Sequence, residues 1–299
     1  MKFHVFLALF SFVHPLSAQI QLTARTAGQV YVLSRATLPR AFVPDAAPLR
    51  SALSWHTLQP GLELSEFTVE AGRLGVDLRV TVLRIEAERF AFSLVQHTRA
   101  NRMTGAWNVN VAPAAAAVAL NAGQFKETGP WGWLVLDGQE RRDPGYGPLS
   151  VGIAFDSSGG VHWIPFDTLA AARADRSIRF AFQSYPTLLF DGRVPALATA
   201  RRGVDQGHRD ARLIFGQEAG GRLLVLLTRY DGLGRTAARV PIGLTLPESI
   251  LLAGALGARH AVMLDGGISA QLLVRAQSGQ TRVWKGMRDV PLALVAIPR

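Results

Sequence analysis

The stretch Val262-Met263-Leu264-Asp265-Gly266-Gly267-Ile268-Ser269 joins an apolar run to a carboxylate, two glycines and a hydroxyl. The apolar run predicts a buried strand, and the Asp-Gly-Gly break places Asp265 at its end. Because glycine has no Cβ, the backbone beside Asp265 can approach a ligand closely. Carboxylates in this setting are typical of active sites. They also occur in ordinary turns, where Asp265 would instead bond its own loop at Gly267.

A helix is predicted just before this strand. Thr245-Leu246-Pro247-Glu248 has the capping-box pattern, in which Thr245 accepts from the backbone near Glu248 and Glu248 reaches back to the cap. Proline is tolerated in a first helical turn because its missing N–H would have no partner there. The apolar residues up to Leu256 form the buried face, and Gly257 is a natural residue to follow the C-cap. The chain then enters the strand from His260 to Leu264.

Most other segments predict short strands joined by Gly- and Pro-rich turns. Alternation of apolar and polar residues marks residues 78–85 and 90–95, and residues 112–120 fit either a helix or a strand. Further strand or hairpin candidates are residues 133–136, 151–155, 162–166, 184–190, 211–215 and 223–227, with a short helix over 169–175. The predicted fold class is α+β, with a mixed β-sheet core, a few packed helices and a β-rich N-terminal part.

Length and composition fit a globular protein with a substantial core. Of 299 residues, 48% are hydrophobic, and we find no internal repeat and no linker long enough to separate two domains. We therefore expect one domain over residues 19–299. The chain has no cysteine, which excludes disulfides and thiolate chemistry.

The first residues have the pattern of a secretory signal peptide. Lys2 precedes an apolar stretch, Phe3 to Val13, and small residues follow at Leu16-Ser17-Ala18. Cleavage after Ala18 would export the protein to the periplasm or the medium. The alternative is an N-terminal membrane anchor, for which the stretch falls short of the roughly 20 residues a spanning helix needs. We expect no stable membrane span elsewhere.

The formal net charge is +10, and lysine occurs only at positions 2, 126 and 285. The arginines are scattered rather than clustered with aromatic residues, which argues against a nucleic-acid partner. An anionic small substrate or an anionic envelope polymer agrees with the charge. Oligomeric state is not indicated by the sequence.

Four further segments, taken in order with the one quoted first, make a recognisable set. They are Ala119-Leu120-Asn121-Ala122-Gly123-Gln124-Phe125, Gln183-Ser184-Tyr185-Pro186-Thr187-Leu188-Leu189-Phe190-Asp191-Gly192, Arg212-Leu213-Ile214-Phe215-Gly216 and Gly243-Leu244-Thr245-Leu246. Each is short, but their order and spacing resemble the phosphodiester glycosidase family over roughly residues 60–297. The resemblance implies an exported hydrolase that cleaves a sugar-1-phosphodiester or a related glycosidic bond, as in the exopolysaccharide-associated bacterial relatives. Its partner would be a phosphate-bearing carbohydrate, small or polymeric.

The family match implies roles for two charged residues. Cleaving a sugar-1-phosphodiester needs a cation for the phosphate and a carboxylate as acid, base or nucleophile. Asp265 is the candidate catalytic carboxylate. Arg212 is the candidate phosphate ligand, since a guanidinium matches phosphate oxygens bidentately. Without the family match, Arg212 would be read as a solvated arginine before a strand.

For most of the remaining candidate site residues, the sequence leaves two or more roles open. Asn121 either donates to the sugar or phosphate, or holds its own loop, with Gly123 allowing the bend. Ser269 either bonds the substrate, orients Asp265 or caps a following segment. The N–H groups of Gly266 and Gly267 form a candidate anion-binding nest. Gln183 either contacts the substrate or ends a strand.

No cofactor is expected from the motifs. No histidine or carboxylate group has the spacing of a zinc site, and no EF-hand-like loop is present, although asparagine and carboxylates are calcium-type ligands. Asp137-Gly138 and Asp191-Gly192 are read as plain turns.

Two residues depart from the family's pattern. Ile268 stands where the family has a third glycine, and Tyr185 stands where it has a glycine before the proline. Bulk at either position would reshape the substrate site. The second hypothesis is therefore a catalytically altered glycan-binding or exopolysaccharide-assembly protein of the same fold.

Overall fold

The computed structural model describes residues 20–43, 48–99, 102–196, 204–230 and 242–299, and strands dominate them. Strands account for 49% and helices for 12%, so the fold is mainly β with a few helices rather than an even α+β mixture. Every strand pairing among these residues is antiparallel, which corrects the expected mixed sheet. About half of these pairs join consecutive strands, many of them through tight turns, which only an antiparallel pair allows, since parallel pairs need long crossovers.

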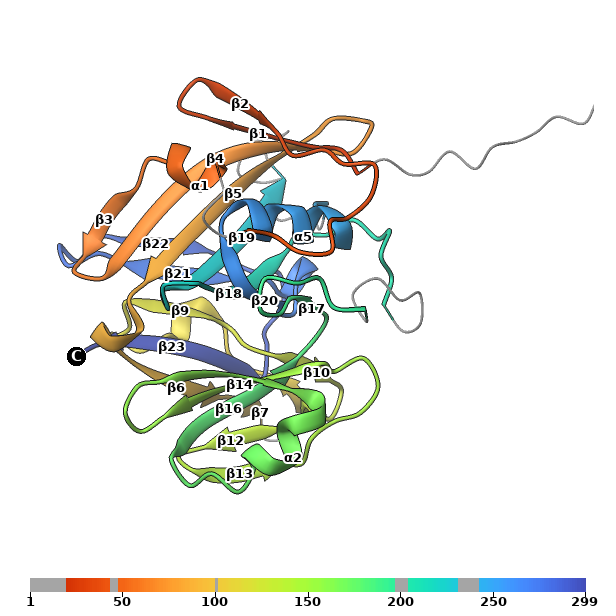
Figure 1. The fold of residues 1–299 in the computed structure, drawn as a ribbon. Helices are drawn as coiled ribbons and strands as arrows, with labels where there is room; N and C mark the ends of the chain where they lie inside the picture. Colours follow the sequence, from red (N-terminus) through yellow and green to blue (C-terminus); the bar gives the residue numbers. More distant parts are fainter. Residues whose placement is uncertain (1–19, 44–47, 100–101, 197–203, 231–241) are drawn as a thin grey trace, which may run out of the picture.

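The largest sheet in the described ranges has nine strands and forms the upper half of the molecule in Figure 1. Its order is β17-β20-β18-β19-β5-β4-β1-β2, with β3 also paired to β4. In chain order the strands are β1 (Leu22–Thr26), β2 (Gln29–Val32), β3 (His56–Gln59), β4 (Leu62–Ala71), β5 (Val76–Ile85), β17 (Thr187–Leu189), β18 (Leu213–Glu218), β19 (Leu223–Tyr230) and β20 (Ala258–Met263).

Two five-stranded sheets complete the core. In Figure 1 one lies at the bottom of the molecule, and the other extends from the lower half up to the level of the nine-stranded sheet. One has the order β13-β12-β16-β14-β15 and the other β22-β21-β9-β23-β6. The first contains β12 (Leu134–Leu136), β13 (Gln139–Arg142), β14 (Val151–Asp156), β15 (Val161–Pro165) and β16 (Ile178–Ser184). The second contains β6 (Phe90–Gln96), β9 (Val118–Asn121), β21 (Leu272–Arg275), β22 (Thr281–Trp284) and β23 (Leu292–Pro298). Two small ribbons pair β7 (Thr98–Arg99) with β8 (Arg102–Gly105), and β10 (Gln124–Lys126) with β11 (Gly129–Trp131).

The three large sheets share one hydrophobic core. Phe92 of β6 stacks on Phe155 of β14 with ring centroids 5.0 Å apart, and Phe155 meets Phe215 of β18 edge-on at 6.4 Å. Each of these rings comes from a different sheet, and all three belong to the same buried cluster. Aromatic side chains bury the most area per residue, so their contact ties the sheets into one unit.

The apolar run of β19 explains why the nine-stranded sheet is buried on both faces. Leu223, Val225 and Leu227 point into the three-sheet core, whereas Leu224 and Leu226 point into a second core on the opposite face. Successive strand residues alternate between faces, so a continuous apolar run requires cover on both.

Helix α5 (Leu246–Ala255) supplies that second cover (Figure 1). Its capping box forms as predicted: Glu248 N–H donates to Thr245 Oγ1 at 3.4 Å, and Thr245 N–H donates to Glu248 Oε2 at 2.8 Å. Gly257 has φ +83°, the left-handed conformation expected after the C-cap, and the chain turns there into β20. The other described helical segments are short: α1 (Pro48–Ala52), α2 (Leu169–Ala172), η2 (Ala87–Arg89), η3 (Val109–Val111), η4 (Phe166–Thr168) and η5 (Gly267–Ser269).

The predicted hairpins over 133–142, 151–166 and 211–227 are present, and so is the β-rich N-terminal part. The ambiguous segment 112–120 ends in a strand, β9, rather than forming a helix. The predicted signal peptide, residues 1–18, lies outside the described residues. Among the helices of the described ranges, none has both the length and the hydropathy to cross a bilayer.

Candidate functional site

Three loops meet where β20 ends. Asn121 Nδ2 donates to the Asp265 carbonyl at 2.8 Å, and Asp265 N–H donates to the Gly123 carbonyl at 3.0 Å. Gly267 N–H donates to the Ala211 carbonyl at 2.7 Å. The segments around Asn121, Arg212 and Asp265, far apart in the sequence, are therefore joined through backbone bonds at one place.

Asp265 is the half-buried carboxylate at this junction. Burial raises its pKa to about 6, while a hydrogen bond from Ser269 and the charge of Arg288 act in the opposite direction. The nearby Asp210 raises it further. A carboxyl that titrates near neutrality in a polar junction is a candidate for proton transfer. The hydrogen bond from Ser269 agrees with the role in which it orients Asp265, and its other two roles stay predictions.

Asp210 was missed by sequence reasoning. Its carboxylate lies so close to Gly267 that a Cβ there would be 2.6 Å from Oδ2, and Gly267 has φ +57°. Burial raises the pKa of Asp210, with Arg212 and His208 pulling it down. The only sequence signal was its place in His208-Arg209-Asp210, directly before the Arg212 motif. Two carboxyls of raised pKa thus face one glycine turn.

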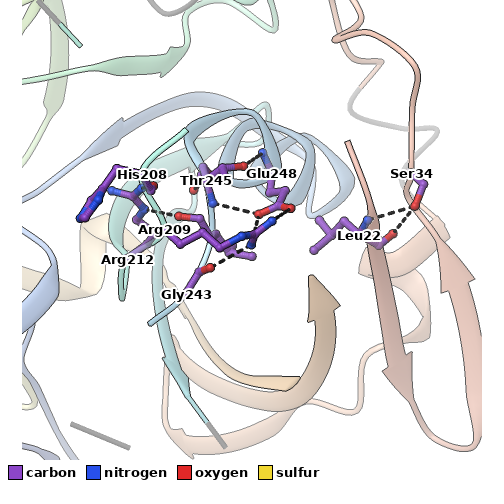
Figure 2. Close-up of polar contacts among 10 residues, drawn as sticks. Leu22, Ser34, His208, Arg209, Arg212, Gly243, Thr245 and Glu248 are labelled. Atoms are coloured by element: carbon purple, nitrogen blue, oxygen red, sulfur yellow. Dashed lines mark hydrogen bonds and ion pairs between the residues drawn. The ribbon is translucent and has the colours of Figure 1, made fainter. Parts of the chain in front are cut away.

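Arg212 is buried with its guanidinium bonded to backbone. Nε donates to the Leu244 carbonyl at 2.7 Å, and Nη2 donates to the His208 carbonyl (Figure 2). Burial lowers its pKa, and Asp210 is the largest influence that raises it. The Arg212 side chain therefore lies near the Asp210 carboxylate. Its hydrogen bonds connect the segment 208–212 to the loop before α5.

The same loop is clamped by a second arginine. Arg209 makes a bidentate pair with Glu248, 2.8 Å to Oε2 and 2.7 Å to Oε1, and also donates to the Gly243 carbonyl at 3.1 Å (Figure 2). Glu248 is the capping residue of α5, so one buried carboxylate both starts the helix and fixes the Asp210 segment. Sequence reasoning found the cap but not the clamp.

The Asn121 side chain forms hydrogen bonds with backbone groups of other segments. Besides its bond to Asp265, its Oδ1 accepts from Gln271 N–H at 3.0 Å. Gln271, also missed, accepts from Val109 N–H at 3.0 Å and donates to the Arg288 carbonyl at 3.3 Å. Gly123 has φ +62°, and a Cβ there would be 3.2 Å from the Gln183 carbonyl. This buried amide chain positions the turn that carries Asp265 and the segment that carries Arg288.

Gln183 also binds backbone. Its Oε1 accepts from Trp133 N–H at 3.0 Å and from Gly145 N–H at 2.9 Å, which ties two loops to β16. The Gly267 N–H is engaged by Ala211, so a nest made of both the Gly266 and Gly267 N–H groups is not preformed, which corrects that expectation.

The two departures from the family pattern differ in their surroundings. Ile268 is 39% exposed and carries no positive φ, so its side chain lies at the rim without straining the turn. Tyr185 is half-buried, and burial and the charge of Asp265 both raise its pKa. Its ring meets Trp131 edge-on at 5.4 Å. Exposed Arg288, whose charge lowers the pKa of Asp265, lies over the Phe125 ring at 4.5 Å.

The described ranges contain no group of three or more His, Asp or Glu side chains placed to hold a metal ion. The arrangement instead offers two protonatable carboxyls, one buried and one exposed guanidinium, and a tyrosine. These groups suit proton transfer beside an anionic substrate.

A family model for phosphodiester glycosidases matches residues 114–297, more than half of the chain. The chain belongs to the phosphodiester glycosidase family. The resemblance seen in the motifs is thereby confirmed, although the match starts later than the residue 60 expected. The family is one of hydrolases, and its name specifies sugars linked through a phosphodiester.

Solved structures share the fold at low identity. The catalytic domain of zebrafish N-acetylglucosamine-1-phosphodiester alpha-N-acetylglucosaminidase, auto-inhibited by its pro-peptide, has a TM-score of 0.62 and 16% identity, over 86% of this chain and 92% of that one. A hypothetical protein from Synechocystis has a TM-score of 0.55 and 17% identity, over 95% and 69%. A Burkholderia pseudomallei protein described as exported has a TM-score of 0.52 and 16% identity, over 75% of each chain. No curated protein sequence matches the chain.

Proposed function

We propose that the protein is an exported hydrolase that cleaves the C1–O bond of a sugar-1-phosphodiester, or a related glycosidic bond, in envelope or extracellular polysaccharide. Export rests on the signal-peptide pattern of residues 1–18, and the reaction type on the family. The observation that carries the chemistry is Asp265, a half-buried carboxyl with a pKa of about 6 that accepts from Ser269 and is flanked by Arg288.

Asp265 acts in its ionised form in this proposal. A phosphate monoester is a stable leaving group, because its own second pKa is about 6, so it needs little help from an acid. The demanding task is to activate water, and a carboxylate that takes a proton from water serves it. The water oxygen bonds to C1, the C1–O bond breaks, and the phosphate leaves with the electron pair.

The phosphate needs positive charge on the same side of the sugar. We assign Arg212 to phosphate binding, with Arg288 as the exposed cation that binds the phosphate from the solvent side. Asn121, Gly123 and Gln183 keep the surrounding loops in place for sugar contacts from Gly266, Gly267 and Ser269. Asp210 is the second carboxyl within reach of the same turn.

The test is a product screen over sugar-1-phosphodiesters and nitrophenyl glycosides with matched carboxyl-to-amide variants. Asp265→Asn is expected to lower kcat by about 10²- to 10⁴-fold, the usual contribution of a proton-transfer group, with the fold retained in circular dichroism. Asp137→Asn is the control, because Asp137 also precedes a glycine but lies exposed in the β12–β13 turn. Wild-type turnover that Asp265→Asn leaves unchanged would refute the assignment.

A glycan-binding or exopolysaccharide-assembly protein is the second candidate. Tyr185 favours it, because an aromatic ring next to Asp265 fills space that a glycine would leave open. This alternative predicts saturable glycan binding with no released sugar after long incubation, and a gain of turnover in Tyr185→Gly. Release of free sugar by the wild type excludes it.

A further inference from the structure

A separate hollow of about 500 Å³ lies beside the candidate site, between the β10–β11 and β12–β13 hairpins. It is lined by Trp131, Gly132, Arg141, Arg142, Asp143 and Gly145. Its volume falls within the range of about 300–1,000 Å³ that ligand sites occupy. Neither the sequence motifs nor the proposed reaction uses these residues.

Glycines and a buried amide build the floor of the hollow. A Cβ on Gly145 would be 2.9 Å from the Cα of Gly132, so only glycines allow these two segments to approach so closely. Gln183 then joins them, accepting from Gly145 N–H at 2.9 Å and from Trp133 N–H at 3.0 Å. The floor of the hollow is therefore fixed by the fold, and the side chains of Arg141, Arg142 and Asp143 form its outer part.

Positive charge around the hollow is in excess. Lys126 lies 3.8 Å above the Trp131 ring, and within the described ranges neither it nor Arg141 forms an ion pair or hydrogen bond with another side chain. Among the residues that the structure describes, the Arg142 guanidinium bonds only the uncharged Thr128 carbonyl. The acidic group in the lining, Asp143, pairs with Arg173 at 2.6 Å. Three cations thus surround the hollow, whereas its lining holds one anion, Asp143, which shares Arg173 with Glu140.

Two aromatic side chains, Trp131 and Tyr185, lie between the hollow and the candidate site. Trp131 meets Tyr185 edge-on at 5.4 Å, and Tyr185 lies close enough to Asp265 for that charge to raise the pKa of its phenol. Tyrosine and tryptophan present a flat apolar face with a polar edge, which suits a sugar ring. Guanidinium and ammonium groups suit the carboxylates or phosphates carried by acidic sugars.

We propose that the hollow around Trp131, Lys126 and Arg141 is a subsite that binds an acidic sugar unit of a polyanionic glycan extending from Asp265. The proposal rests on the proposed function, because it makes the natural substrate an acidic polymer rather than a small sugar phosphodiester. The subsite supplies affinity for the polymer and takes no part in bond cleavage.

Binding is tested first, without turnover, by isothermal titration calorimetry of the whole chain. The probes are an alginate hexasaccharide, which carries a carboxylate on each unit, and cellohexaose, which carries none. The wild type is expected to bind the alginate probe at least ten-fold more tightly, and the preference to weaken with added salt. The double variant Lys126→Ala/Arg141→Ala is expected to lose that preference.

Arg73→Ala is the matched control, an exposed arginine in the turn between β4 and β5. It is expected to leave both affinities within two-fold of wild type. Equal affinity for the two hexasaccharides, or an alginate affinity that the double variant leaves intact, would overturn the subsite.

Turnover then separates this inference from the proposed reaction. In the double variant, kcat/KM for a sugar-1-phosphodiester with a small leaving group is expected to stay unchanged. For the same phosphodiester carrying an acidic oligosaccharide, KM is expected to rise about ten-fold with kcat unchanged. If neither phosphodiester is cleaved by the wild type, the reaction is refuted, and the calorimetry alone decides the subsite.

Discussion

Two carboxyls of raised pKa, Asp265 and Asp210, face the glycine turn after β20, and the charge of Asp210 raises the pKa of Asp265. Burial is the main cause in both, because a charged carboxylate loses hydration there. Ser269 and Arg288 favour the ionised form of Asp265, and Arg212 favours that of Asp210. These opposing influences leave Asp265 poised near neutrality, which suits a group that takes up and releases protons.

The first prediction concerns the pH dependence of turnover. Because the ionised form of Asp265 is the active one, kcat/KM is expected to rise with pH around a midpoint of about 6. Ser269→Ala removes a hydrogen bond that lowers this pKa, so its midpoint moves to higher pH. Ser278→Ala, in an exposed turn, leaves the profile in place. A rate that falls as pH rises through 6 contradicts the role of Asp265 as base or nucleophile.

The second prediction concerns stability, measured by urea unfolding at pH 4 and pH 7.5. Between the ordinary pKa of 3.8 and about 6, folded Asp265 holds its proton while the unfolded residue has lost it. Stability therefore falls as pH rises through this window. Asp265→Asn removes the penalty, and its free energy of unfolding at pH 7.5 should exceed wild type by up to about 3 kcal/mol.

That gain should shrink to less than about 1 kcal/mol at pH 4, where the folded carboxyl is protonated and the unfolded one is only about half ionised. Asp137→Asn, in its exposed turn, should show no pH-dependent difference. An Asp265→Asn variant less stable than wild type at pH 7.5 would contradict the burial penalty.

Helix α5 is the element that organises the site. Its capping box starts the helix, its apolar face covers the nine-stranded sheet, and the turn at Gly257 sends the chain along β20 toward Asp265. Glu248 connects the start of α5 with the Asp210 segment, because its buried carboxylate caps the helix and also forms the ion pair with Arg209.

The third prediction separates the cap from the clamp by urea unfolding. Thr245→Ala removes only the cap acceptor and should cost about 1 kcal/mol. Glu248→Ala also leaves Arg209 without its buried partner and should cost about 3 kcal/mol or more. Glu86→Ala, which breaks the exposed pair with Arg89, should cost less than about 1 kcal/mol. Equal losses for Thr245→Ala and Glu248→Ala would show that the clamp adds nothing.

At the scale of the whole molecule, three sheets depend on one core. β6 from the first third of the chain pairs with β23 at its end, and β9 lies between β23 and β21. Phe92, Phe155 and Phe215 join the sheets at the centre. No sheet can lose its packing without exposing the apolar face of another.

The fourth prediction is therefore a single unfolding transition, the same by circular dichroism, tryptophan fluorescence and activity. Phe215→Ala should move all three signals together and cost about 3–5 kcal/mol, since it opens a cavity where the sheets meet. Leu74→Ala, 94% exposed, should leave the transition unchanged. Separate transitions for the sheets would show that they fold as independent units.

The sequence alone determined the local features of this protein. The capping box of α5, the left-handed Gly257, the hairpin turns and the strand that ends at Asp265 all depend on neighbouring residues, so their patterns are readable directly. The family was also recognisable from the order of its glycine-based motifs. Segment 112–120 was ambiguous because alanine fits either structure, and β9 forms there because β21 and β23 pair with it.

Tertiary structure decided what the polar side chains do. The sequence left both a substrate contact and a structural role open for Asn121 and Gln183, and in the structure both bond backbone more distant in the chain. Gln271 and the hollow at Trp131 carry no local signal, and Asp210 carries only its place before the Arg212 motif, because each owes its position to loops brought together by strand pairing. The raised pKa of Asp265 has the same origin. Burial and nearby charge depend on the packing of distant segments, and no pattern of neighbouring residues specifies them.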